Sequence, residues 1–72
     1  MKYREIGEFI ALKRKEKGLT QSQLAEIIDV SDKSVSKWEC GGSIPGYSMI
    51  KLLSDALEIE ASELISVVAD NI

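Results

Sequence analysis

The 72-residue sequence predicts an all-α fold, a single compact domain of five short helices spanning residues 1–72. Three observations predict it. The length is that of one domain. Apolar residues recur at helical spacing in five segments, which are separated by capping residues or glycines. No segment shows the alternation of apolar and polar residues that is typical of a β-strand. We place the helices at about residues 4–17, 21–28, 32–40, 47–57 and 61–67.

The first predicted helix, residues 4–17, places Ile6, Phe9 and Ile10 on one face. Its last turn is rich in lysine, and cations are favourable at the C-terminal end of the helix dipole. Gly18 follows that turn, as expected of a residue that ends a helix in the left-handed conformation.

The second predicted helix, residues 21–28, begins at a capping box. Thr20 is followed three residues later by Gln23, so each side chain can bind a backbone N–H at the helix start. The apolar face of this helix is predicted to hold Leu24, Ala25, Ile27 and Ile28.

The third predicted helix, residues 32–40, begins after Ser31, a good N-cap residue, and ends before Gly41. Val35 and Trp38 are expected to face inward. The residues expected to face outward are small or charged, and they are Asp32, Lys33, Ser34, Ser36 and Lys37.

The fourth predicted helix, residues 47–57, has a wide apolar face, which is typical of the floor of a core. Gly46 stands where a side-chain cap would be expected, so the start of this helix is weakly capped. The fifth predicted helix covers residues 61–67. The apolar residues of the two helices are Met49, Ile50, Leu52, Leu53, Ala56, Leu57, Leu64, Ile65 and Val68.

The composition excludes several classes of protein. With one cysteine, Cys40, and no histidine, the chain has no internal disulfide and no zinc site. Cys40 is expected to be an inert thiol, with a redox switch as the alternative. No segment reaches the 18 or so apolar residues of a membrane span, and the charged start lacks a signal-peptide pattern. No catalytic constellation is present, so we do not expect an enzyme or a cofactor. The composition as a whole is that of a cytoplasmic protein, with no metal or membrane partner expected.

The net charge of −3 argues by itself against binding to nucleic acid. The charge is unevenly distributed, however. Residues 1–42 hold 8 basic and 7 acidic residues, whereas residues 43–72 hold 1 and 5. A basic cluster at Lys13, Arg14, Lys15 and Lys17 lies in the first part, and it either solvates a helix or meets phosphate.

The segments 21–28 and 32–40 are two short helices joined by about three residues, which is the pattern of a helix-turn-helix. Further motifs occur at consistent spacing: Ile6-Gly7, Arg14-Lys15-Glu16-Lys17-Gly18-Leu19-Thr20-Gln21, Leu24-Ala25-Glu26, Val30-Ser31, Val35-Ser36-Lys37-Trp38-Glu39, Gly41 and Pro45. With these motifs the sequence resembles the Cro/lambda-repressor-type (XRE-type) helix-turn-helix family of bacterial and phage transcriptional regulators. The resemblance covers roughly residues 4–66 and implies a lambda-repressor-like DNA-binding domain.

The resemblance implies that residues 32–40 enter the major groove. The side chains facing base edges would be Asp32, Lys33, Ser36 and Lys37. A lysine can donate to guanine O6 and N7, and an aspartate can accept from cytosine N4. The alternatives are that both lysines contact only phosphate and that Asp32 only complements the helix dipole.

The resemblance also implies phosphate contacts. Gln21 would reach a phosphate with its side chain and backbone N–H, where the helix dipole favours an anion, or would simply be the first residue of its helix. Backbone N–H groups just after the helix predicted at residues 32–40 would hold a second phosphate. Gly41 and Gly42 in this segment would also end that helix. The phosphate-contacting residues are Thr20, Gln21, Ser34, Gly41, Gly42 and Ser43.

Arg14 and Glu39 match an ion pair of the same family that ties the first helix to the end of the third. Arginine suits this role because its planar guanidinium can bind a carboxylate with two parallel bonds. The alternative is two solvated charges whose interaction contributes less than about 1 kcal/mol.

The resemblance therefore implies a sequence-specific regulator of transcription, expected to be a repressor, or the DNA-binding domain of a longer one. The partner is double-stranded DNA, bound as a homodimer, because one short helix reads few base pairs. The dimer contact is expected at the fifth helix and the tail, at Ile65, Val67, Val68 and Ile72. The alternative is that these residues cap the core of a monomer. The alternative to DNA binding is an antitoxin-like module that keeps the fold but binds a protein.

Overall fold

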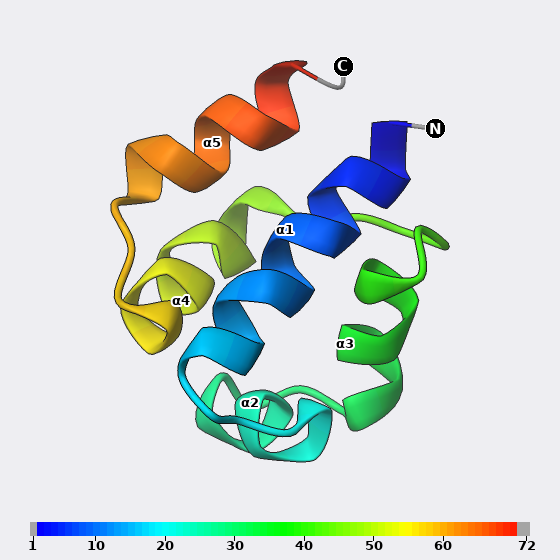
Figure 1. Ribbon diagram of the computed structural model, residues 1–72, viewed down its shortest axis with the longest axis vertical. Helices are drawn as coiled ribbons and strands as arrows, with labels where there is room; N and C mark the ends of the chain where they lie inside the picture. Colours follow the sequence, from blue (N-terminus) through cyan, green and yellow to red (C-terminus); the bar gives the residue numbers. More distant parts are fainter. Residues whose placement is uncertain (1, 71–72) are drawn as a thin grey trace.

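Five helices follow one another in the computed structural model, which describes the backbone of residues 2–70 and the side chains of residues 4–66 (Figure 1). No strand occurs within residues 2–70, and the predicted all-α, five-helix class is confirmed. α5 continues past the predicted end at Val67, and α1 begins before the predicted start at Arg4. The helices are α1 (Lys2–Glu16), α2 (Gln21–Ile27), α3 (Asp32–Glu39), α4 (Tyr47–Leu57) and α5 (Ala61–Asp70).

The helix starts follow from local side-chain chemistry. The predicted capping box is present: Thr20 Oγ1 accepts from the Gln23 N–H at 3.0 Å, and Gln23 Oε1 accepts from the Thr20 N–H at 2.8 Å. Ser31 Oγ accepts from the Ser34 N–H at 3.3 Å and so caps α3. Gly46 offers α4 no side-chain cap, as predicted.

Residues with positive φ follow four of the helices, at Gly18, Asp29, Gly41 and Glu58. Gly18, just after α1, has φ +71°, as predicted. Glu58 ends α4 in the same conformation, with φ +57°, although glutamate carries the steric cost that glycine avoids. The Glu58 carboxylate lies 2.7 Å from Lys17 Nζ, so this residue also links the α4–α5 connection to the end of α1.

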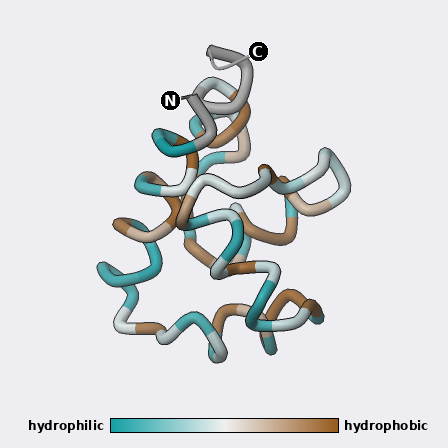
Figure 2. Tube along the Cα trace, turned by 90° about the vertical axis from the view of Figure 1, so that its right-hand side faces the viewer, coloured by the Kyte–Doolittle hydropathy of each residue, from teal (hydrophilic) through white to brown (hydrophobic). Residues whose placement is uncertain are grey.

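The core is built around α1, which packs against α3 and α5, while α2 packs against α3 and α4 against α5 (Figure 1). Brown and teal segments follow one another within single turns of the trace, as expected of helices with one buried face (Figure 2). The largest fully buried side chains come from all five helices. They are Ile6, Ile10, Leu24, Val35, Leu53, Leu57 and Leu64.

Two residues predicted to belong to apolar faces are exposed instead. Ile27 is 57% exposed, because α2 buries the side that carries Leu24 and Ala25. Leu52 is 44% exposed, because it points to the opposite side of α4 from the buried Leu53-containing face. In both helices the buried stripe is narrower than the set of apolar residues.

α1 and α3 approach each other closely at Gly7, which is buried. A β-carbon built on Gly7 would overlap the carbonyl oxygen of Trp38 and lie 2.7 Å from that of Glu39. Only glycine fits here, so α1 sets the position of the last turn of α3. No helix within residues 2–70 is both long and apolar enough to span a membrane.

Candidate nucleic-acid interface

α3 presents a polar, solvent-exposed face. Its inward side chains, Val35 and Trp38, are 0% and 6% exposed and belong to the core. Residues four apart lie on the same side of a helix. The predicted base-facing residues form two such pairs, Asp32 with Ser36 and Lys33 with Lys37, so they share one surface. All four are exposed.

The two lysines of this face have no acidic partner. Among residues 4–66 the ion pairs involve four other cations, and neither Lys33 nor Lys37 takes part in one. Their ammonium groups are therefore available to an external anion or to a base edge.

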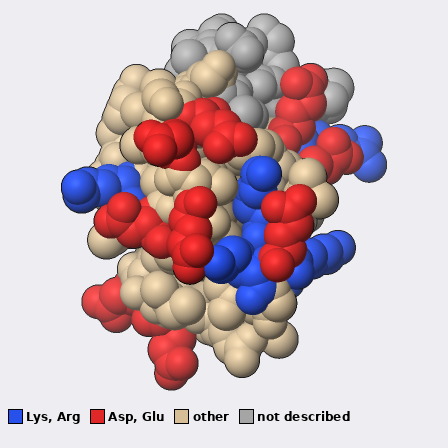
Figure 3. All heavy atoms as spheres, turned by 60° about the vertical axis from the view of Figure 1, so that its left-hand side comes forward, with Lys and Arg blue, Asp and Glu red and all other residues tan. Residues whose placement is uncertain are grey.

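The predicted basic cluster of α1 does not form a cationic patch. Lys13 Nζ lies 3.6 Å from Glu16 and 5.6 Å from the centre of the Phe9 ring, and Lys17 Nζ lies 2.7 Å from Glu58. The face drawn in Figure 3 shows the consequence, since basic and acidic side chains lie next to each other over it. These lysines mainly neutralise neighbouring carboxylates.

Thr20 and Gln21 lie side by side at the start of α2, where the first N–H groups of the helix point outward. The Thr20 hydroxyl oxygen already accepts the Gln23 N–H, so what it can offer an anion is its O–H donor. Gln21 Nε2 donates to Glu39 Oε1 at 3.0 Å, and the same nitrogen keeps a second N–H. The sequence did not predict this contact.

The loop after α3 differs from a simple row of N–H donors. The Gly41 N–H donates to the Trp38 carbonyl at 3.2 Å, and the Gly42 N–H donates to the Lys37 carbonyl at 2.8 Å. Both N–H groups thus bind carbonyl oxygens at the end of α3. The two glycines can therefore assist phosphate binding only by letting a phosphate approach the backbone closely. Of the three predicted residues, Ser43 alone has an N–H without a hydrogen bond inside residues 2–70.

Two further polar residues lie near this surface. Ser34 is half-buried, and its hydroxyl lies 3.2 Å from the Ser31 hydroxyl within the cap of α3. Cys40 is an exposed free thiol that donates to the Lys37 carbonyl at 3.5 Å. No group of residues with metal-ligand character lies within the described part of the chain.

Arg14 and Glu39 form a two-bonded ion pair between α1 and the last residue of α3. Arg14 Nε lies 2.6 Å from Glu39 Oε2, and Arg14 Nη2 lies 2.9 Å from Oε1. The side chains are only 11% and 8% exposed. Arg14 Nη1 also donates to the Leu19 carbonyl at 2.7 Å, so the guanidinium holds the chain just before α2 as well.

The environment of the pair shifts both pKa values in the direction that keeps it charged. The hydrogen bond to Glu39 raises the pKa of Arg14 above its ordinary value. Burial alone would raise the pKa of Glu39, but hydrogen bonds from Arg14 and Gln21 outweigh burial and lower it. The carboxylate therefore stays ionised throughout the neutral range.

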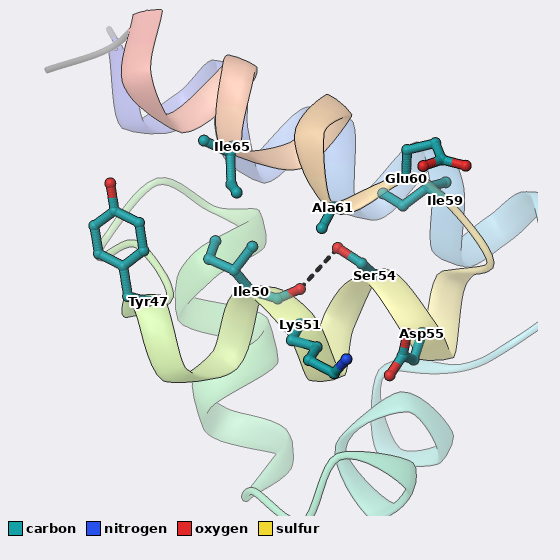
Figure 4. Close-up of a pocket in the computed structure, with 9 residues that line it drawn as sticks. All are labelled: Tyr47, Ile50, Lys51, Ser54, Asp55, Ile59, Glu60, Ala61 and Ile65. Atoms are coloured by element: carbon teal, nitrogen blue, oxygen red, sulfur yellow. Dashed lines mark hydrogen bonds between the residues drawn. The ribbon is translucent and has the colours of Figure 1, made fainter.

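A groove of about 470 Å³ lies between α4 and α5, on residues the sequence did not group together. In Figure 4 Ile50 and Ile65 point toward each other across it, with Tyr47 at one end. Tyr47 is 77% exposed and Ile65 38%. Charges of both signs, Lys51, Asp55 and Glu60, line its polar edge.

Comparison with known proteins places this geometry in a family. The family model for a helix-turn-helix matches residues 10–64. The chain is 39% identical over 62 residues to the HTH-type transcriptional activator BcrR of Enterococcus faecalis, covering 86% of this chain and 30% of BcrR. It is 38% identical over 60 residues to the cryptic phage CTXphi transcriptional repressor RstR of Vibrio cholerae, covering 83% of this chain and 54% of RstR.

A solved structure agrees with the sequence matches. The P22 c2 repressor, crystallised in complex with a synthetic operator, superimposes with a TM-score of 0.77 at 30% identity, covering 82% of this chain and 89% of that one. The chain spans 30% and 54% of the lengths of BcrR and RstR. The motifs, the five helices and these matches agree: the chain belongs to the helix-turn-helix family of Cro/lambda-repressor type.

Proposed function

We propose that this chain binds double-stranded DNA sequence-specifically and thereby regulates transcription, with α3 as the element that enters the major groove. One observation carries the proposal: of the four lysines of residues 4–66 that take part in no ion pair, Lys33 and Lys37 are the two that share one helix, and both are exposed on α3. Unpaired cations on an exposed helix face can neutralise DNA phosphates and release their counterions, and this release is a main source of affinity for DNA. The exposed face of α3 carries two lysines and one aspartate, so its charge is opposite in sign to the acidic average of the chain.

Within this proposal the residues divide into two kinds. Asp32, Lys33, Ser36 and Lys37 read base edges from the exposed face of α3. Phosphates are bound around that helix and fix its register without reading sequence. The proposed phosphate-binding residues are Thr20, Gln21, Ser34 and Ser43, while Gly41 and Gly42 let a phosphate approach the backbone.

The named relatives support a regulatory role: one is called a transcriptional activator, another a transcriptional repressor, and the c2 repressor was crystallised with operator DNA. We propose repression for this chain, because a domain seated in the major groove excludes other proteins from the same site. It is a non-enzymatic role that is carried out in the cytoplasm.

Binding to duplex DNA should weaken steeply with salt. Each phosphate that a lysine or backbone amide neutralises should contribute about −0.9 to the slope of log K against log salt concentration. Titration of a labelled random-sequence duplex at several salt concentrations measures the slope. A flat response, or no binding at low salt, would contradict the proposal and favour the antitoxin-like, protein-binding alternative.

We propose that the molecule acts on DNA as a two-fold homodimer through the groove between α4 and α5. The groove combines exposed apolar atoms of Tyr47 and Ile65 with both Lys51 and acidic residues. A surface with both charge signs can match itself across a two-fold axis. The other predicted contacts, Val67, Val68 and Ile72, lie outside the residues whose side chains the structure describes.

Selected DNA sites should accordingly contain two half-sites about 34–36 Å apart. Ile65→Asp should abolish the paired arrangement, because it places a charge in the apolar centre of the contact. Leu12→Ser is the matched control, since Leu12 is 53% exposed but does not line the groove. Enrichment of single, unrepeated sites by the wild-type protein would refute the dimer.

A further inference from the structure

The Glu39 carboxylate connects two elements of the proposed interface. Its Oε1 accepts from both Arg14 Nη2, at 2.9 Å, and Gln21 Nε2, at 3.0 Å, while Oε2 accepts from Arg14 Nε at 2.6 Å. Glu39 is the last residue of α3, and Gln21 is the first residue of α2. One buried carboxylate therefore joins the end of the base-reading helix to the side chain proposed to bind phosphate.

This contact decides which way the Gln21 carboxamide faces. The terminal torsion of a glutamine is broad, so an unconstrained amide samples many orientations. Once one Nε2 N–H donates to Glu39, the amide plane is fixed and its nitrogen is distinguished from its oxygen. The second N–H then has a defined direction before DNA arrives, which reduces the entropy lost on binding.

Arg14 makes this arrangement compatible with DNA. An unpaired carboxylate next to a phosphate would repel it, but Arg14 binds both oxygens of Glu39 and cancels its charge. Arg14 also prevents Glu39 from turning away, because both bonds would have to break together. Arg14 thus fixes the position of the Glu39 carboxylate, and Glu39 in turn fixes the orientation of the Gln21 amide.

We infer that Glu39 is a positioning residue for the phosphate contact of Gln21, an inference that rests on the proposed DNA-binding function. If Glu39 orients Gln21, then the contribution of Gln21 to DNA affinity depends on an acceptor at position 39. If Glu39 serves only to stabilise the fold through Arg14, the contribution of Gln21 is independent of that acceptor.

The test compares the cost of Gln21→Ala in three backgrounds: wild type, Arg14→Met with Glu39→Met, and Arg14→Met with Glu39→Gln. Both double backgrounds remove the ion pair, and only the second keeps an acceptor at position 39. In wild type, Gln21→Ala should weaken binding to an enriched duplex by about tenfold, as expected for a hydrogen bond to a charged group. The cost should fall below about twofold with Glu39→Met and return to about tenfold with Glu39→Gln.

Dissociation constants at one fixed salt concentration provide the readout, and a melting curve for each variant establishes that it is folded at the assay temperature. An equal cost of Gln21→Ala in all three backgrounds would overturn the inference while leaving DNA binding intact. Loss of any duplex binding by the wild-type protein would instead refute the proposed function.

A second measurement uses the wild-type protein and does not depend on the variants folding. In an NMR spectrum, the Gln21 side-chain amide proton that is bonded to the Glu39 carboxylate should be shifted downfield and should exchange slowly with water. The Gln23 amide is an internal reference, because Gln23 is exposed and its amide oxygen accepts the Thr20 N–H, while its amide nitrogen donates no hydrogen bond within residues 4–66. A Gln21 amide that is indistinguishable from that of Gln23, in both position and exchange with water, would overturn the inference.

Discussion

Gly7→Ala should destabilise the protein by at least about 3 kcal/mol, out of about 4–10 kcal/mol expected for a chain of this length. Helix propensity alone predicts the opposite sign, since alanine is better than glycine inside a helix by about 1 kcal/mol. The added methyl group, however, overlaps the backbone carbonyl oxygens of Trp38 and Glu39, and backbone cannot move aside like the end of a side chain. Chemical denaturation of both proteins measures the difference.

Gly46→Ala is the matched control, because a β-carbon on Gly46 meets nothing within 4 Å and its φ of −73° suits alanine. Its effect should stay within about 1 kcal/mol. If Gly7→Ala were as well tolerated as the control, then α1 and α3 would not be fixed against each other as the structure has them.

Arg14→Ala should also be strongly destabilising, by about 3–5 kcal/mol, because it leaves the Glu39 carboxylate buried without its cation. The Leu19 carbonyl loses a donor at the same time. DNA affinity should fall with stability, since the end of α3 is no longer held. Melting curves at neutral pH measure the loss of stability, and a duplex titration measures the loss of affinity. Lys15→Ala is the control, because Lys15 is an exposed neighbour outside the ion pairs of residues 4–66. It should change stability by less than about 0.5 kcal/mol.

The pH dependence provides an independent check on the pair. The pKa of Glu39 is lower in the folded chain than its ordinary value of 4.5, so its stabilisation is complete above that pH. Below it the unfolded chain binds a proton first, and the contribution is lost as the pH falls through the folded pKa. The gap in melting temperature between wild type and Arg14→Ala should therefore narrow in acid. A constant gap from pH 7 to pH 3 would contradict the buried ion pair.

The helices could be predicted because their boundaries depend on neighbours in sequence. The cap at Thr20 involves a residue three positions away, and so does the cap at Ser31. The family motifs then identified α3 as the recognition helix. The exposure of Ile27 and Leu52 could not be predicted in the same way, because it depends on how much of each apolar set the neighbouring helices cover.

The site was less predictable than the fold, since its contacts join residues far apart in sequence. Gln21 and Glu39 are 18 residues apart, and no spacing rule relates them. The pairing of Lys17 with Glu58 likewise depends on where α4 ends. The family ion pair related Glu39 to Arg14 of the first helix and not to Gln21, so an acceptor for the Gln21 amide could not be predicted from the sequence.

The most direct test of the central claim, that α3 reads DNA sequence, is selection from a random duplex library at low salt with wild type, Lys33→Ala, Lys37→Ala and Lys15→Ala. Wild type should enrich a defined site. Lys33→Ala should lose about 1–3 kcal/mol on that site and relax preference at one or two base positions, because its donors face a base edge. Lys15→Ala, which removes an exposed lysine of α1 outside the groove and outside the ion pairs of residues 4–66, should enrich the wild-type sequence. An unchanged profile for Lys33→Ala together with Lys37→Ala would show that α3 is not the reading element.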